Sequence, residues 1–466
     1  MSIHGLLRNA PRNAFCALLT GAALLGAQAP SPASRLEDRF HEAMAAQDRG
    51  EAKKAESILR ELHSTHPGLF AVDESLGLLY VSQERFAEAL LLLEAAAREN
   101  PKSDAAHANL GAAYFRLKRK ADALEQFEIA ARLNPDNAAT QQSLGRLWMD
   151  THHPDRAAEA FAEVLRLQPA DADAAIDEAV ALQAAGEAAK AMEALNRMPG
   201  VDGSAAAQVL LGELSEKQND VKAAGQHFAR AVELDPSEQN VWELGVEFLR
   251  HWSFEPAIRE FEAAVTQFPQ STRMRLGLGA AYFGNGNYAK ALPVFADLLH
   301  DDANNRLYAE LLGMSCLAES HESQPRCTEL VAYAQAHPSD AMAATYAASA
   351  LVQGRASDEE SRLARQLLDR AIKADPKLAE AYYQRGLLKQ LQADWKGSIP
   401  DLEAAIQRKP DFAKAHYRLA LACWRDGRKA DAQREMDLQQ KFSKQQQEDL
   451  DRQLRQITVF IVDTHR

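Results

Sequence analysis

The sequence predicts an all-α protein, a solenoid of stacked helix-turn-helix repeats, and three observations carry this prediction. A small residue recurs every 33 to 35 residues along most of the chain. A second small residue follows 12 positions later, and an aromatic or large aliphatic residue follows four positions after that. Proline closes most of the units. Self-similarity at a fixed period in this range is typical of proteins whose repeated units stack on one another.

The first small position sets the frame for aligning the units. It holds Gly77, Gly111, Gly145, Ala179, Gly212, Gly245, Gly279, Gly313, Gly386 and Ala420. The second small position holds Ala89, Ala123, Ala157, Ala191, Ala224, Ala257, Ala291, Ser398 and Ala432. The large position holds Leu93, Phe127, Phe161, Leu195, Phe228, Phe261, Phe295, Leu402 and Met436. Because the gap from Gly313 to Gly386 has room for two units, we expect about twelve repeats.

Each unit is expected to form two antiparallel helices. In the third unit these are Ala105 to Leu117 and Ala121 to Leu133, with apolar residues spaced along one face of each. Gly111 and Ala123 remove side-chain bulk where the two helices cross, so that their axes can approach to roughly 8–10 Å. Pro293 and Pro400 fall at the same repeat position, early in a second helix, where we expect a first-turn position that tolerates proline.

The repeats divide the chain into two predicted arrays and two end segments. Residues 36–199 are expected to form an N-terminal array of about five repeats, and residues 203–440 a C-terminal array of about seven, irregular near 319–360. The stretch "MPGVDGSA" between the arrays suggests a hinge. Residues 441–466 are expected to form a capping helix and tail, because the end of an array needs a cap with a polar outer face.

Residues 1–33 have the composition of an export signal. Arg8 and Arg12 give a basic start, and an apolar run follows from Ala14 to Ala27, which is short for a transmembrane helix. "AQA" or "SPA" resembles a cleavage site, although Pro30 would hinder cutting at the first. The segment is therefore expected to be a signal peptide, with an uncleaved anchor or a dispensable tail as the alternatives.

The bulk composition limits the classes of partner. The 466 residues are 46% hydrophobic and 26% charged, as in folded soluble proteins, and the formal net charge is −13. Negative charge argues against binding to nucleic acid or to an anionic membrane. We therefore expect no nucleic-acid partner, and contact with a membrane only if the N-terminal segment is uncleaved.

The pattern of small, aromatic and proline positions resembles the tetratricopeptide repeat family over about Leu36 to Gln440. The early tryptophan of that family is replaced here, for example by Asp73, His107 or Tyr382. The resemblance implies a right-handed superhelical solenoid whose first helices line a concave face. It also implies that a protein partner, as a peptide or a helix, binds in that groove.

Sequence motifs for catalysis are missing. "HEAMA" at His41 and "HESQP" at His321 begin like a zinc-protease motif, but Ala45 and Pro325 take the place of the second histidine. The sequence has no phosphate loop, no GxSxG elbow and no Cys-x-x-Cys pair. The sequence therefore predicts a protein that is not an enzyme, with no cofactor and no metal site.

Three cysteines follow the predicted signal segment. Cys316 and Cys327 flank the turn of the irregular ninth repeat, where a disulfide could form in an oxidising compartment. Cys316 and Cys423 occupy the same core-facing repeat position, where buried free thiols are equally consistent with the pattern. Both interpretations stay open on the sequence.

Candidate binding residues are those that the repeat frame turns towards the groove. They are Arg146, Glu213, Trp242, Arg250, Arg273, Tyr383, Lys414, Tyr417 and Arg425. Trp242, Tyr383 and Tyr417 share one repeat position, and aromatic and arginine side chains are the usual anchors of interfaces. The alternative for these rings is packing between neighbouring first helices.

The function expected from these observations is that of a non-catalytic interaction scaffold of the cell envelope, exported to the periplasm or secreted. The alternative is an accessory arm of an enzyme complex in protein or glycan processing, with catalysis carried by the partner.

Overall fold

The computed structural model describes residues 32–318, 327, 329–352 and 356–445. The predicted signal segment, apart from its last residues, and residues 446–466 of the predicted capping helix and tail lie outside the described residues. The chain divides into two compact units, unit 1 from Met1 to Asp202 and unit 2 from Gly203 to Arg466. Each unit is described by itself below.

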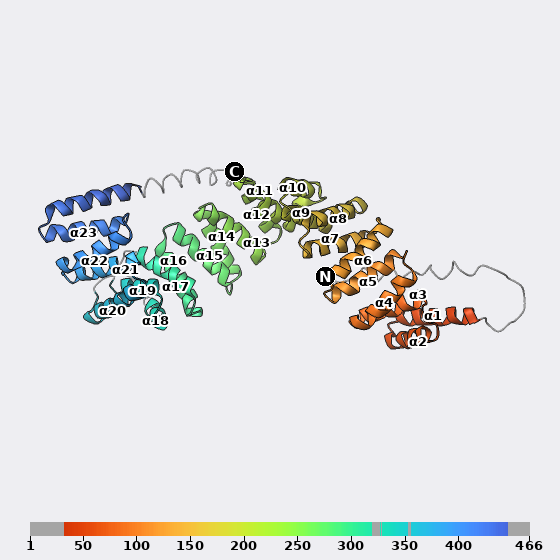
Figure 1. Ribbon diagram of the computed structural model, residues 1–466. Helices are drawn as coiled ribbons and strands as arrows, with labels where there is room; N and C mark the ends of the chain where they lie inside the picture. Colours follow the sequence, from red (N-terminus) through yellow and green to blue (C-terminus); the bar gives the residue numbers. More distant parts are fainter. Residues whose placement is uncertain (1–31, 319–326, 328, 353–355, 446–466) are drawn as a thin grey trace, which may run out of the picture. The chain divides into compact units, whose positions relative to one another are not determined.

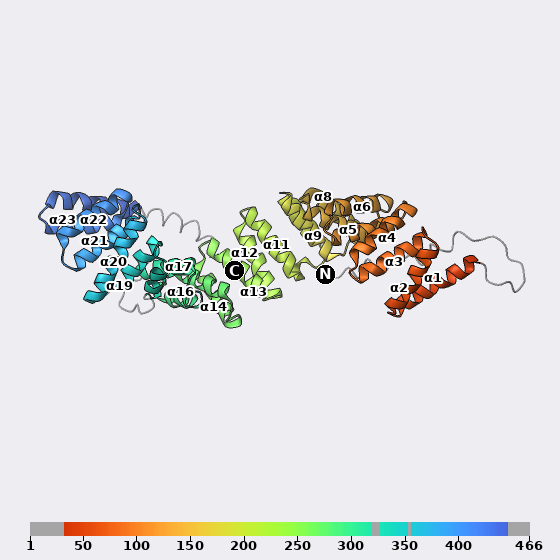
Figure 2. The same ribbon diagram turned by 60° about the horizontal axis from the view of Figure 1, so that its bottom comes forward.

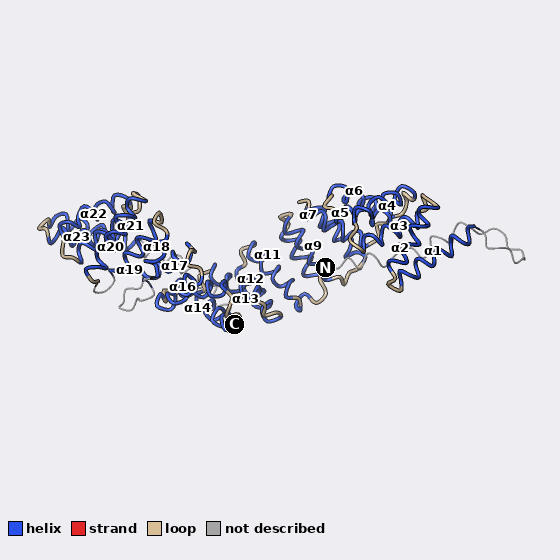
Figure 3. Tube along the Cα trace, turned by 90° about the horizontal axis from the view of Figure 1, so that it is seen from below, coloured by secondary structure: helices blue, strands red, loops and turns tan. Residues whose placement is uncertain are grey.

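Both units consist of helices joined by short turns (Figure 1). Unit 1 contains α1 (Pro32–Asp48), α2 (Ala52–Thr65), α3 (Phe70–Ser82), α4 (Phe86–Glu99), α5 (Asp104–Arg116), α6 (Lys120–Leu133), α7 (Ala138–Asp150), α8 (Pro154–Leu167), α9 (Ala172–Ala184) and α10 (Ala188–Arg197). A 3-10 turn, Val201–Gly203, follows at the boundary along the chain. Among the residues that the structure describes, Figure 3 shows helices and loops and no strand.

Unit 2 contains the remaining helices. They are α11 (Ala205–Lys217), α12 (Val221–Leu234), α13 (Glu238–Arg250), α14 (Phe254–Gln267), α15 (Thr272–Gly284), α16 (Tyr288–Asp301), α17 (Arg306–Ala318), α18 (Glu329–Ala336), α19 (Ala341–Val352), α20 (Asp358–Ala374), α21 (Ala379–Leu391), α22 (Trp395–Arg408), α23 (Ala413–Arg425) and a helix over residues 429–445.

Consecutive helices pack as pairs, α1 with α2, α3 with α4 and onward, and within each unit most pairs pack on the next (Figure 2). With the helix 429–445 paired to α23, the described residues form twelve such pairs. The predictions of an all-α solenoid and of about twelve repeats are therefore confirmed. No helix within the described ranges is both long and apolar enough to cross a membrane.

The helix ends follow from local sequence. Eight first helices begin behind a Ser, Asn or Asp side chain that accepts a hydrogen bond from a backbone N–H three residues later, which is the usual N-cap geometry. These caps are Ser103, Asn137, Asp171, Ser204, Ser237, Ser271, Asn305 and Asp340. The turn inside many pairs needs a positive φ, and glycine supplies it at Gly186, Gly286 and Gly427.

The small and large repeat positions meet in the core. A Cβ atom added to Gly245 would lie 2.3 Å from Cζ of Phe261, and one added to Gly279 would lie 2.5 Å from Cε1 of Phe295. Both rings are fully buried. The first small position therefore holds glycine in these repeats because the aromatic ring of the same repeat occupies the place of a side chain there.

The interpretation of Pro293 was wrong. Pro293 is the sixth residue of α16 and Pro400 the sixth of α22, beyond the first turn of each helix. Each proline therefore removes one backbone hydrogen bond from its helix.

The ninth repeat departs from the frame because its second helix, α18, has only eight residues. The space over Gly313 is filled instead by Tyr346 of α19, whose ring would lie 2.1 Å from an added Cβ. The tenth repeat compensates with a long second helix, α20, of 17 residues behind the capping box of Ser357 and Glu360.

Candidate partner-binding groove

Unit 2 contains a groove of about 1020 Å³ along four successive first helices. These are α17, α19, α21 and α23, and the helix 429–445 closes one side. The lining residues are Leu317, Ser349, Val352, Glu380, Tyr383, Gln384, Leu387, Leu391, Lys409, Phe412, Ala413, Lys414, Tyr417, Arg418, Gln439 and Ser443. The stacking of pairs places the first helices side by side, so that one surface spans several repeats.

The floor of the groove is aromatic and aliphatic. Tyr383 is buried, and its ring lies 4.9 Å from that of Phe412. Tyr417 and Leu391 line the same groove with 43% and 58% of their surface exposed. Large apolar side chains that remain this exposed inside a concave surface are candidates to be covered by a partner.

The charged residues of the groove are mainly basic. Lys409, Lys414 and Arg418 line it together with a single carboxylate, Glu380. Burial raises the pKa of Glu380, against the opposing effects of a hydrogen bond from Gln384 and of the two lysines. Gln384 Nε2 donates to Glu380 at 2.8 Å. Gln384 Oε1 is buried and accepts no hydrogen bond from the described residues.

Three of the predicted binding residues lie in this groove, namely Tyr383, Lys414 and Tyr417. Trp242 occupies the same repeat position farther along the chain, but it is half-buried and packs against Phe261 with 6.0 Å between ring centroids. The same frame position therefore faces a groove in the last repeats and packs against the core in the seventh.

Arg250 and Arg273 form ion pairs with carboxylates of the protein itself. Arg250 Nη1 donates to Glu247 Oε2 at 2.6 Å. Arg273 Nε donates to Glu238 Oε1 at 2.6 Å, and its guanidinium lies 6.0 Å from the ring of Trp242. These contacts fix both side chains along the helices.

The remaining predicted residues lie on other exposed parts of the first helices. Arg146 is exposed and pairs with Asp177 at 3.4 Å. Arg425 is exposed and stacks on Trp395 with 4.1 Å to the ring centroid, and Glu213 is exposed on α11. None of the three lines the groove of unit 2.

The structure joins Cys316 and Cys327 in a disulfide, with 6.2 Å between their Cα atoms. This bond ties the end of α17 to the segment before α18, in the repeat whose second helix is shortest. Cys423 is a buried free thiol, and burial raises its pKa.

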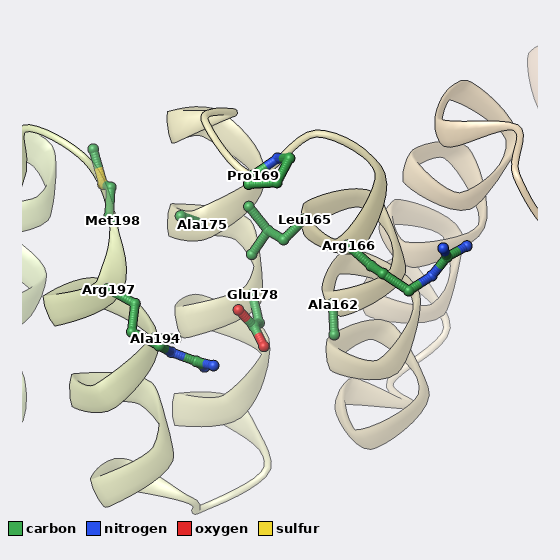
Figure 4. Close-up of a pocket in the computed structure, with 9 residues that line it drawn as sticks. All are labelled: Ala162, Leu165, Arg166, Pro169, Ala175, Glu178, Ala194, Arg197 and Met198. Carbon is green, nitrogen blue, oxygen red and sulfur yellow. The ribbon is translucent and has the colours of Figure 1, made fainter.

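Unit 1 holds a smaller cavity of about 390 Å³ between α8, α9 and α10 (Figure 4). Helix α10 has ten residues, whereas most second helices have 14, and the missing turn leaves this space unfilled. Figure 4 shows the guanidinium of Arg197 directed towards Glu178. Burial raises the pKa of Glu178, and the charge of Arg197 opposes that rise.

Sequence reasoning missed a set of charged residues that stand where the repeats otherwise carry core side chains. Glu178 and Arg385 occupy the position of Leu110 and Leu144, one residue before the first small position. Glu247 occupies the position of Leu147, two residues after it. These residues could have been found by aligning the repeats, since they are charged at positions that hold leucine in several other repeats. A charged side chain at a buried position needs an oppositely charged or hydrogen-bonding partner.

Models of the tetratricopeptide repeat match five segments of the chain. One model matches residues 75–138, 143–202 and 383–433, a second matches residues 253–314 and a third matches residues 205–238. Together they cover more than half of the sequence. No curated protein matches the chain.

Several solved structures are similar in fold. They include the Naa15/Naa10 structure with bound HypK-THB (15% identity, 87% of this chain and 68% of that chain, TM-score 0.43), PilF of Pseudomonas aeruginosa (19%, 46% and 97%, 0.37) and YrrB, described as a TPR protein with an unusual peptide-binding site (17%, 39% and 94%, 0.37). The matched models and the twelve helix pairs agree, and this chain belongs to the tetratricopeptide repeat family.

Proposed function

We propose that this protein is a non-catalytic scaffold that binds a partner protein through the groove of α17, α19, α21 and α23. The occupant is a peptide segment, extended or helical, that carries apolar side chains next to carboxylates. The observation that supports this most directly is the combination of exposed Tyr417 and Leu391 with Lys409, Lys414 and Arg418 in one concave surface. Tetratricopeptide repeat scaffolds typically serve protein–protein interaction, which agrees with this proposal.

The groove has the size and chemistry for a peptide of several residues. At about 1020 Å³ it is at the upper end of typical ligand pockets, roughly 300–1,000 Å³. A peptide side chain laid against Tyr417 and Leu391 would remove their exposed apolar surface from water, which favours binding by about 25 cal/mol per Å². Carboxylates on the same peptide would meet the three basic side chains, and this fixes the orientation of the peptide more than its affinity.

Export to the cell envelope is part of the proposal. It is supported by the basic and apolar composition of residues 1–33 and by the disulfide between Cys316 and Cys327, since disulfides persist mainly in oxidising compartments. Fractionation of cells that express the chain, followed by N-terminal sequencing of the mature protein, tests it. A mature chain that starts at Met1 in the cytoplasmic fraction would refute export.

Binding is tested by crosslinking and pull-down from those cells with Tyr417→Ala and Lys414→Glu. We expect each substitution to reduce recovery of the partner at least fivefold, which corresponds to about 1 kcal/mol of binding free energy. Lys396→Glu on the second helix α22 makes the same charge change outside the groove and serves as the matched control. Recovery that falls equally in all three variants, or in none, would overturn the groove assignment.

A further inference from the structure

One side chain of unit 2 breaks the repeat frame without an obvious structural reason. Glu247 on α13 is fully buried, with 0% of its side chain exposed. The equivalent positions of the other aligned repeats hold only small or apolar residues: Leu79, Ala113, Leu147, Ala181, Leu214, Ala281, Ser315, Leu388 and Ala422. A carboxylate placed among such residues loses its hydration, so it needs a compensating positive charge or a metal ion.

Glu247 forms a cluster with Glu216 of α11 and His251, which follows α13 directly. His251 Nε2 lies 3.0 Å from Glu216 Oε2 and 3.2 Å from Glu247 Oε1. The three ligand-capable atoms of this cluster lie within 4.8 Å of one another. Glu247 and His251 are one helical turn apart, so a single turn presents both towards the same point.

The hydrogen bonds of the protein leave one oxygen of this cluster unsatisfied. Arg250 Nη1 donates to Glu247 Oε2, while the contact of His251 Nε2 with Glu216 has hydrogen-bond geometry. His251 Nε2 also lies 3.2 Å from Glu247 Oε1, but no hydrogen bond joins these two atoms. Glu247 Oε1 is buried and has no hydrogen-bond partner among the described residues.

The backbone around the cluster also favours a cation. Glu216 lies in the last turn of α11, which ends at Lys217, and Glu247 lies in the last turn of α13, which ends at Arg250. The C-terminal end of a helix carries a partial negative charge. Two such ends, together with two carboxylates, meet at this point.

We propose that Glu216, Glu247 and His251 bind a divalent transition-metal ion such as Zn²⁺. Bonds of about 2.0–2.2 Å from Zn²⁺ to nitrogen and oxygen ligands in tetrahedral geometry correspond to ligand separations of about 3.3–3.6 Å. The observed separations of 3.0 and 3.2 Å from His251 Nε2 are shorter by a few tenths of an ångström, so small side-chain rotations would admit the ion. In the bound state the imidazole proton would be on Nδ1, the lone pair of Nε2 would face the ion, and the ion would be the partner that Glu247 Oε1 lacks.

Access and charge are consistent with a three-ligand site. The side chains of Glu216 and His251 are 24% and 22% exposed, so an ion can reach the cluster from solvent. Arg250 stays on the far oxygen of Glu247, where it orients the carboxylate. Two carboxylates, one arginine and a divalent ion leave one net positive charge, which an anionic ligand at the open coordination position can offset.

Linear motifs in the sequence do not reveal this cluster. Glu216 comes from one repeat, and Glu247 and His251 come from the next, so the spacing is longer than in the short ligand pairs of zinc motifs. Packing of adjacent repeats brings the ends of α11 and α13 together.

The test is a Zn²⁺ titration of the untagged full chain by isothermal calorimetry, with thermal unfolding measured alongside. We expect one saturable site per chain and an unfolding midpoint that rises with Zn²⁺ concentration. Glu247→Leu and His251→Ala should each weaken binding at least tenfold. Glu243→Gln, one turn earlier on α13, should bind as the wild type does.

Glu247→Leu is expected to fold, because leucine is the residue that four other repeats carry at this position. Without metal, this variant should melt at a higher temperature than the wild type, since it removes the buried carboxylate. With Zn²⁺ the wild type should gain stability and the variant should not. If Zn²⁺ leaves the wild-type midpoint unchanged, or if Glu247→Leu binds as tightly as the wild type, the cluster is an ion-pair network and the proposal is wrong.

Discussion

Gly245→Ala tests the physical reason for the repeat pattern, because one methyl group enters a space that a ring already fills. The added Cβ would lie 2.3 Å from Cζ of Phe261, whereas carbon atoms in contact are normally about 3.5–4.0 Å apart. The ring would therefore have to move by more than about 1 Å. It cannot move away easily, because a Cβ on Gly277 of α15 would lie 2.5 Å from the same fully buried ring.

Two opposing contributions set the change in the free energy of unfolding that Gly245→Ala should cause. Overpacking of a tight core costs about 1–3 kcal/mol, and the upper part of that range is appropriate for a ring held from both sides. Replacing a helix-interior glycine by alanine contributes about 1 kcal/mol of stability. We expect Gly245→Ala to lower the free energy of unfolding by about 1–2 kcal/mol. Gly111→Ala, where the nearest ring atom of Phe127 lies at 3.1 Å, should be close to neutral.

Hydrogen exchange read by mass spectrometry on peptides from α13 to α15 measures the local free energy of opening, even if the two units unfold separately. A double-mutant cycle with Phe261→Leu isolates the contact, since the smaller side chain gives the methyl group room. We expect a coupling of about 1 kcal/mol or more between Gly245→Ala and Phe261→Leu. Equal stabilisation by Gly245→Ala and Gly111→Ala, or an additive cycle, would refute the packing argument.

Three further changes have signs that follow from the structure. Because burial raises the pKa of Glu380 above its value in the unfolded chain, the wild type should gain stability as the pH falls from neutral through that pKa, and Glu380→Gln should flatten this part of the urea-midpoint profile. Reduction of Cys316–Cys327, which closes 11 residues, should lower the free energy of unfolding by about 2–3 kcal/mol in denaturant titrations of oxidised and reduced protein. Glu178→Leu restores the usual core residue beside the 390 Å³ cavity and should raise the thermal midpoint, whereas a lower midpoint would mean that the contact with Arg197 outweighs the burial of the carboxylate.

Most of the fold could be predicted from the sequence, because the packing that defines it repeats. Gly245 with Phe261 and Gly279 with Phe295 are the same contact made twice, so the pattern is visible by aligning the chain with itself. Pro293 was misinterpreted because it was assigned to the first turn of a helix in which it is the sixth residue. Helix boundaries are the least certain part of such an assignment. The short α18 could not be predicted, since its compensation by Tyr346 comes from the next repeat.

The candidate groove could be predicted only in part. The frame correctly assigns Tyr383, Trp242 and Tyr417 to equivalent positions on first helices. Their burial nevertheless differs, because exposure at that position is set by the neighbouring repeats. Tyr417 lies near the end of the array, where fewer side chains cover it, while Trp242 is packed on the ring of Phe261. Periodicity gives the direction of a side chain, and the irregular neighbours decide whether it stays available.

Charged residues at positions that are mostly apolar in the other repeats indicate function more specifically than the repeat pattern does. They fall into two groups, according to whether the protein itself supplies all of their hydrogen-bond partners. Arg385 replaces a core leucine, and the protein itself compensates it, since Asp401 accepts two of its N–H groups and Asp369 a third. Such a residue exchanges hydrophobic packing for a salt-bridge network and needs no ligand. Glu247 makes the same kind of replacement with one oxygen left unsatisfied beside a histidine and a second carboxylate. A repeat protein tolerates such a site because only the adjacent repeats lose stability. In the proposed site the bound ion would supply the partner that the buried carboxylate lacks.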